Sequence, residues 1–130
     1  MLGSSRPLKP ISVLPEIREL IDSAPGILKR DISRIKSLLL DPNAVLPVPI
    51  VSFTLQEAKD ALDLLLAHSL QLTQWQKEPI TDTERAEVTR LQAAIPEIRP
   101  LIQRLITLAT ELEHRAKTGS TSRRKKWRHH

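Results

Sequence analysis

Six residues near the C-terminus, Arg123-Arg-Lys-Lys-Trp-Arg128, place five cations and one indole side by side. Clusters of Lys and Arg bind phosphate backbones, because each neutralised phosphate releases condensed counterions. Arg adds paired hydrogen bonds to phosphate oxygens, and the indole of Trp127 can stack on an exposed base. This cluster therefore predicts that the chain binds RNA or DNA through the backbone, with little sequence preference.

The excess of positive charge begins at Arg115. Seven of the 20 Lys and Arg residues lie from this point onward, and none of the 15 Asp and Glu residues follows Glu113. Such a run also occurs as a localisation signal, as an anchor for anionic lipid, or as a solubilising end without a target, and these alternatives stay open. The candidate nucleic-acid-binding residues of this region are Arg115, Lys117, Arg123, Arg124, Lys125, Lys126, Trp127 and Arg128.

A second, smaller basic surface is expected around an apolar stripe in the first third of the chain. Asp31 is the only acid there, so the surrounding helix surface should be positively charged. Phe53 and Trp75 are expected in the core, so the folded part would contact nucleic acid by charge and shape rather than by stacking on bases. The candidate residues of this surface are Lys29, Arg30, Arg34 and Lys36.

Residue types that carry catalysis or bind metals are present, but not in working arrangements. The chain has no Cys, which excludes thiolate nucleophiles, thiolate metal sites and disulfides. Glu111 and His114 have the spacing used in di-iron helical bundles, but that site needs a second such pair and two further Glu residues. There is no Gly-x-Ser-x-Gly elbow and no Gly-rich phosphate loop. We therefore expect a non-catalytic protein with no metal site and no cofactor.

The apolar pattern predicts a helical scaffold for these side chains. Apolar residues recur at steps of three and four in three separate segments, which is typical of amphipathic helices. The 130 residues are 40% apolar and only 2% aromatic, with three Gly and ten Pro, which favours an aliphatic helical core over strands and hairpins. We expect one all-α bundle of four to five helices, joined by Pro-rich connections and followed by a disordered basic C-terminal tail.

Prolines set the expected helix boundaries, because proline removes a backbone hydrogen bond and kinks or ends a helix. A break is expected at Pro25, a break or a strong kink at Pro96 and Pro100, and a Pro-rich connection over 41–50. Thr54 and Thr81, each followed by Glu three residues later, have the spacing of a capping box at a helix start. The predicted helices cover residues 15–22, 25–40, 54–75, 83–94 and 101–117.

The sequence thus divides into a flexible lead-in at 1–12, a bundle at 13–117 and a disordered basic tail at 118–130, which is too charged to offset its ordering entropy. No stretch reaches the roughly 18–20 apolar residues of a membrane span, and the N-terminus lacks the apolar core of a secretory signal. Absence of Cys fits a reducing compartment. We expect an intracellular, cytoplasmic location, or a nuclear one in a eukaryote.

These observations predict a small subunit of a protein–nucleic acid assembly. Leu64, Leu66 and Leu70 lie off the main stripe of the helix expected at 54–75. This helix should therefore either be central in the bundle or contact a protein partner or a second copy. In size and charge only, the chain resembles the small helical subunits of CRISPR effector complexes, which is an analogy. The alternative is a protein–protein adaptor or self-assembling structural protein whose tail is a localisation or membrane-surface signal.

Overall fold

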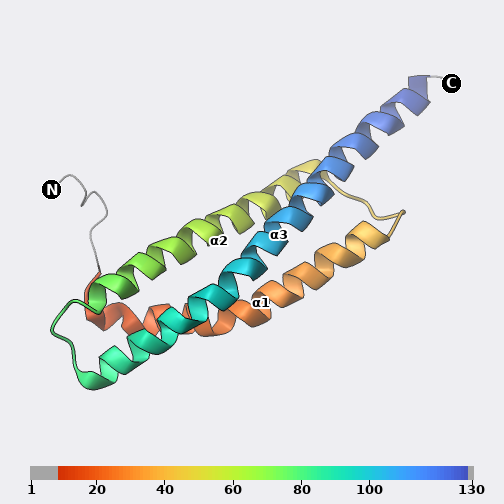
Figure 1. The fold of residues 1–130 in the computed structure, drawn as a ribbon. Coiled ribbons are helices and arrows are strands. Elements are labelled where there is room, and N and C mark those ends of the chain that lie inside the picture. The colour runs from red at the N-terminus through yellow and green to blue at the C-terminus, as the bar shows by residue number, and fades with distance from the viewer. Residues whose placement is uncertain (1–8, 129–130) are drawn as a thin grey trace, which may run out of the picture.

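The computed structural model describes residues 9–128, with side chains described as far as 119, and they form an all-α fold (Figure 1). A short 3-10 turn, η2 (Ile11–Val13), leads into three long helices: α1 (Leu14–Leu40), α2 (Val48–Trp75) and α3 (Asp82–Arg128). Both α1 and α2 run alongside α3, which continues past the end of the bundle (Figure 1). No strand occurs between residues 9 and 128.

Helix α3 is central because its apolar residues alternate at steps of three and four over nine positions. This is the spacing of a coiled-coil seam, which keeps one side of a helix against its neighbours. All nine are buried except Ile95, which is partly buried. The nine seam residues are Val88, Leu91, Ile95, Ile98, Ile102, Leu105, Ala109, Leu112 and Ala116.

The expected number of four to five helices is wrong, because three of the predicted proline breaks lie inside continuous helices. Pro25 is inside α1, and Pro96 and Pro100 are inside α3. Each costs roughly 3 kcal/mol in a helix interior. Buried apolar residues keep the same register on both sides, as Ile21 and Leu28 do around Pro25. Burial stabilises by about 1.5–3 kcal/mol for each such side chain, which offsets the lost hydrogen bond.

The connections between helices are shorter than the sequence predicts. Helix α2 begins at Val48 with Pro49 in its first turn, where the missing N–H needs no partner. Thr54 therefore lies inside α2, where its hydroxyl donates to the Ile50 carbonyl at 3.0 Å, and the predicted capping box there is wrong. The box at Thr81 is confirmed: its N–H donates to Glu84 Oε1 at 2.9 Å, and the Glu84 N–H donates to Thr81 Oγ1 at 3.1 Å.

The last helix does not end near Lys117, as the sequence predicts, but continues to Arg128. Gly119 does not adopt the left-handed conformation that commonly ends a helix, so the backbone stays helical through it. The backbone of residues 118–128 is thus helical where a disordered tail is expected, and residues 129–130 lie outside the described part. Below, "extension" means α3 from Lys117 to Arg128.

The end of the predicted lead-in is attached to α2. The Lys9 N–H donates to Gln71 Oε1 at 2.7 Å, and the Lys9 carbonyl accepts from the Trp75 indole N–H at 2.9 Å. Residues 1–8 of that lead-in lie outside the described residues. Trp75 is fully buried, as predicted, whereas the prediction that Phe53 lies in the core is wrong, since its side chain is 63% exposed.

Candidate functional site

Arg115 joins α3 to the end of α1. Its Nη1 donates to the carbonyls of Leu38 at 3.2 Å and Leu39 at 2.6 Å, and its Nη2 donates to the Asp41 carbonyl at 2.7 Å. The last carbonyls of a helix have no partner within the helix and favour a positive charge nearby. Helix α1 has no basic residue in its own last turn, so α3 supplies one. This candidate residue therefore has a structural contact that the sequence does not reveal.

Lys117 and Glu113 lie one turn apart on α3 at the base of the extension. The Lys117 Nζ is 3.7 Å from Glu113 Oε1, and the lysine side chain is 60% exposed. Glu113 Oε2 also accepts a hydrogen bond of 2.6 Å from the Ser52 hydroxyl of α2. That hydrogen bond, assisted by the charges of Lys117 and Lys59, lowers the pKa of Glu113. The carboxylate therefore links α2 to α3 where the extension leaves the bundle.

The extension carries most of the candidate residues. Its helical backbone would span about 18 Å at the usual rise per residue. Successive residues of a helix are turned by about 100°, so positions 123–128 lie on every side of the axis. The seam residues end at Ala116, and Lys117, Thr118 and Gly119 are all exposed. The side chains of Arg123, Arg124, Lys125, Lys126, Trp127 and Arg128 lie outside the described residues.

The second basic surface lies on the later half of α1. Lys29, Arg30 and Lys36 are exposed, and the Arg34 side chain is 67% exposed with Nη1 3.8 Å from Asp31 Oδ1. The predicted stripe beneath them is confirmed: Leu28, Ile32 and Ile35 are buried, and Leu39 is partly buried. Because Arg115 holds the end of α1 against α3, this surface and the extension lie at the same end of the bundle (Figure 1).

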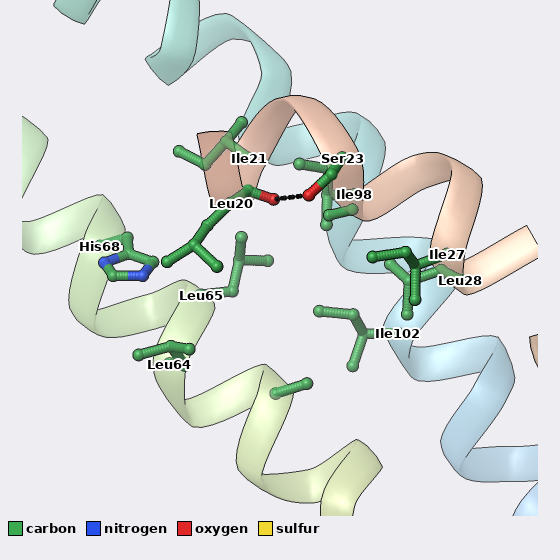
Figure 2. A pocket seen from close by; sticks show the side chains of 12 residues that line it. Leu20, Ile21, Ser23, Ile27, Leu28, Leu64, Leu65, His68, Ile98 and Ile102 are labelled. Carbon is green, nitrogen blue, oxygen red and sulfur yellow. Dashed lines mark hydrogen bonds between the residues drawn. The ribbon is translucent and has the colours of Figure 1, made fainter. Parts of the chain in front are cut away.

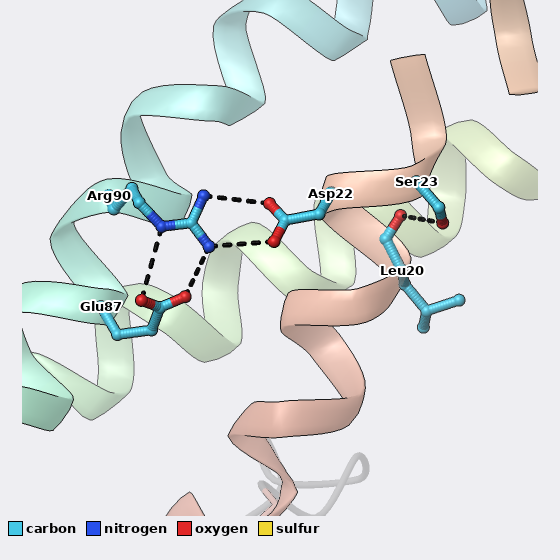
Figure 3. A network of polar contacts seen from close by, with 5 residues as sticks. All are labelled: Leu20, Asp22, Ser23, Glu87 and Arg90. Atoms are coloured by element: carbon cyan, nitrogen blue, oxygen red, sulfur yellow. Dashed lines mark hydrogen bonds and ion pairs between the residues drawn. The ribbon is translucent and has the colours of Figure 1, made fainter. Parts of the chain in front are cut away.

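The opposite end of the bundle carries acidic residues interspersed with the basic residues Arg18, Arg85 and Arg90. Arg90 of α3 makes two hydrogen bonds of 3.0 Å to the Asp22 carboxylate of α1 and also pairs with Glu87 (Figure 3). The Arg90 hydrogen bond lowers the pKa of Asp22, and the two carboxylates raise the pKa of Arg90. The acids gathered near the starts of α1 and α3 are Glu16, Glu19, Asp22, Asp82, Glu84 and Glu87.

Helices α1 and α2 leave an apolar groove between them, with α3 as its floor (Figure 2). The groove has a volume of about 210 Å³. Leu20 and Ile27 of α1 are 50% and 49% exposed at one rim, and Leu64 of α2 is 49% exposed at the other. The floor is formed by Ile98 and Ile102. The sequence places Leu64 off the main stripe of α2, but it does not predict the residues of α1 that face it.

His68 lies in this groove beside Leu20 and is only 7% exposed (Figure 2). Its Nε2 has no hydrogen-bond partner among the described residues. Burial, assisted by the charge of Lys9, lowers the pKa of His68, so the ring is neutral at physiological pH. It is the one ionisable side chain that lines the groove.

Other kinds of site are not found in the described part of the chain. Among the side chains described there, no three His, Asp or Glu residues are placed to hold a metal ion. No helix between residues 9 and 128 is both long enough and apolar enough to cross a membrane. Comparisons of the chain with models of protein families, with curated proteins and with solved structures found no match.

Proposed function

We propose that this protein is a non-catalytic subunit of a protein–nucleic acid assembly, and that the extension of α3 binds the phosphate backbone. The observation that carries the proposal is the continuation of α3 for about three turns beyond Ala116, the last buried seam residue. Five of the last six residues of that helix are Lys or Arg, and no acid follows Glu113. Nucleic-acid binding implies an intracellular location, cytoplasmic or nuclear.

The energetics of the extension favour a partner with many negative charges. Its closely spaced cations repel one another, and residues 117–119 bury no side chain that would compensate. A phosphate backbone relieves this repulsion and releases counterions, with a gain that grows with each phosphate contacted. The cation-rich extension thus contributes little to the stability of the fold, whereas it can make many contacts to a polyanion.

The distribution of charge over the bundle supports the same partner. Both basic regions lie at one end of the bundle, whereas at the other end Arg90 is paired with Asp22 and Glu87. A polyanion should therefore be attracted to the end that carries both basic regions. Lys29 and Lys36 of the second basic surface would add contacts by charge and shape once the extension is bound.

Arg115 and Lys117 have different roles in this proposal. The guanidinium of Arg115 holds the end of α1, so it positions the extension rather than contacting phosphate. Lys117 is 60% exposed on the first turn of the extension, where it can reach a phosphate bound further along. The analogy to small subunits of CRISPR effector complexes adds only the idea that such a bundle lines the nucleic acid within a larger complex.

Binding of labelled oligonucleotides, followed by fluorescence anisotropy, tests the proposal. We expect the full chain to bind single-stranded and duplex nucleic acid, and a variant with Arg123, Arg124, Lys125 and Lys126 changed to Gln to lose most of that affinity. The matched control changes Lys29, Arg30, Arg34 and Lys36 to Gln, and it should retain most of the affinity. Equal loss in both variants would mean that the extension is not the principal site.

Two further measurements separate the proposal from its alternatives. A lipid anchor would bind vesicles containing anionic lipid in preference to nucleic acid, and an inert solubilising end would bind neither. Trp127→Ala should weaken binding to single strands by about 5- to 160-fold, the equivalent of roughly 1–3 kcal/mol, and should spare duplex binding. An unchanged affinity for single strands would remove stacking from the proposal and leave the phosphate contacts.

A protein–protein adaptor is the second candidate function, and the observation that favours it is the apolar groove between α1 and α2. In that case the extension would serve as a localisation or membrane-surface signal. The vesicle measurement distinguishes the adaptor that has a membrane-surface signal, since only that protein binds anionic vesicles more tightly than oligonucleotides.

A further inference from the structure

The face of the bundle formed by α1 and α2 is not covered by another helix between residues 9 and 128. Helices α1 and α2 both pack on α3 but make hardly any direct contact with each other. The groove between them leaves Leu20, Ile27 and Leu64 about half exposed. Leu20 and Ile27 lie two turns apart on the same side of α1, so they form a ridge that a second apolar surface could cover.

The exposed side of α2 continues this apolar surface toward the other end of the groove. Phe53 and Leu64 lie three turns apart on one side of α2, and Phe53 is 63% exposed. Ile50, also 63% exposed, lines a second hollow between the end of α1 and the start of α2, together with Leu38. The apolar surface of the α1–α2 face therefore has two parts, one around Leu64 and one around Phe53 and Ile50, with charged residues between them.

The two rims of this face carry opposite charges. On α1, Arg30 and Arg34 follow Ile27 by one and two turns and are exposed. On α2, Glu57 and Asp60 lie between Phe53 and Leu64 and are exposed. Since α1 and α2 are antiparallel, the basic part of α1 and the acidic part of α2 lie at the same height, as both Arg34 and Glu57 line the second hollow.

We propose that a second copy of this chain covers the face, with α1 of each copy lying on α2 of the other around a two-fold axis parallel to the helices. This arrangement places Leu20 and Ile27 of one copy against Leu64 of the other. It also places Arg30 and Arg34 opposite Glu57 and Asp60, twice by symmetry. Packing α1 on α1 around an axis of the same direction would instead bring the arginines of both copies together.

The size of the face suits a stable dimer. Helices of 27 and 28 residues are each about 40 Å long and about 10 Å wide, so α1 and α2 side by side present a face about 20 Å wide. The face of each copy is therefore roughly 800 Å², which is the area that one partner buries in an interface of standard size. Because the axis is parallel to the helices, both extensions would project from the same end of the dimer and offer one polyanion two basic arms.

Sedimentation equilibrium of the full chain, freed of nucleic acid by nuclease and high salt, tests the proposal. We expect the mass of a dimer at micromolar concentrations. Leu64→Glu should weaken the dimer more than 100-fold, because it places a charge in the middle of the interface. The matched control is Leu70→Glu, since Leu70 is 68% exposed on another side of α2, and it should leave the dimer intact. A strictly monomeric protein at hundreds of micromolar would overturn the proposal.

A charge exchange between copies tests the orientation. Arg34→Glu and Glu57→Arg should each weaken the dimer by about tenfold, because each replaces two attractions by two repulsions. Mixing the two variants should restore the dimer, since each arginine then meets an acid on the other copy. Dimers that are unaffected by either variant would contradict the packing of α1 on α2. Far-UV circular dichroism checks that the helices remain, which separates loss of the dimer from loss of the fold.

Discussion

Helix α3 has two parts that share one backbone conformation and differ in what their side chains do. As far as Ala116, each position of the three-and-four repeat is apolar and covered by α1 or α2. Beyond it, the corresponding positions 119, 123 and 126 are Gly, Arg and Lys. The first part is stabilised by packing, whereas the second has no apolar side to pack. The length of a helix therefore does not have to match the length over which it packs in the core.

The largest effect expected from this comparison is on stability. Leu91→Ala should lower the free energy of unfolding by about 2–5 kcal/mol, because Leu91 is fully buried in the seam. Deletion of residues 119–130 should change it by no more than about 0.5 kcal/mol, as for surface changes in general. Urea unfolding followed by circular dichroism measures both. A deletion as damaging as Leu91→Ala would show that the extension contributes to the core.

A smaller loss of stability is expected at Arg115, which lies where the packed part of α3 ends and the extension begins. Arg115→Ala should cost about 1.5–3 kcal/mol, because it removes a charged donor from three carbonyls at the end of α1. Lys117→Ala, two residues on, is the matched control and should cost no more than about 0.5 kcal/mol. Arg115→Lys should recover only part of the loss, since an ammonium lacks the planar fork. A cost of Arg115→Ala as small as that expected for Lys117→Ala would contradict the structural role of Arg115.

The start of α3 should contribute to stability as well. Thr81→Ala removes one half of the reciprocal capping box and should cost about 1 kcal/mol, or a fall of roughly 3–5 °C in the midpoint of thermal unfolding. Thr54→Ala is its control, because Thr54 bonds to a carbonyl within α2 and caps nothing. If Thr54→Ala lowered the midpoint as much as Thr81→Ala, the assignment of the helix starts would be wrong.

The smallest expected effect is on the pH dependence of stability, which should differ between a buried histidine and an exposed one. The pKa of His68 is lowered from its ordinary value of 6.5 in the folded chain, so the unfolded chain takes up the proton first. The contribution of His68 to stability is therefore complete above about pH 6.5 and falls as the pH drops below it. His68→Gln should flatten this decline between pH 6.5 and 5, and His114→Gln, at an exposed position of α3, should not. Urea unfolding at several pH values measures the slopes.

The sequence predicts the helical class and the buried stripes, because both follow from apolar periodicity within one segment. The helix ends predicted at Pro25, Pro96 and Pro100 are wrong, because each proline removes only one backbone hydrogen bond. Burial of apolar residues along the whole helix compensates for that local loss. The role of Arg115 and the exposure of Phe53 depend on which helix ends and faces lie against each other. The sequence of a single helix does not reveal this packing. The groove at Leu64 needs both α1 and α2 in place, so the sequence shows only half of it.

The most direct test of the account is the salt dependence of duplex binding by the full chain and by a chain ending at Thr118. If the extension neutralises about five phosphates, the logarithm of the affinity should fall with the logarithm of salt concentration at a slope near −4 to −5. The shortened chain should bind weakly, with a slope near −1 or no measurable binding. Equal affinities and slopes for the two chains would contradict the claim that the extension of α3 is the nucleic-acid-binding site.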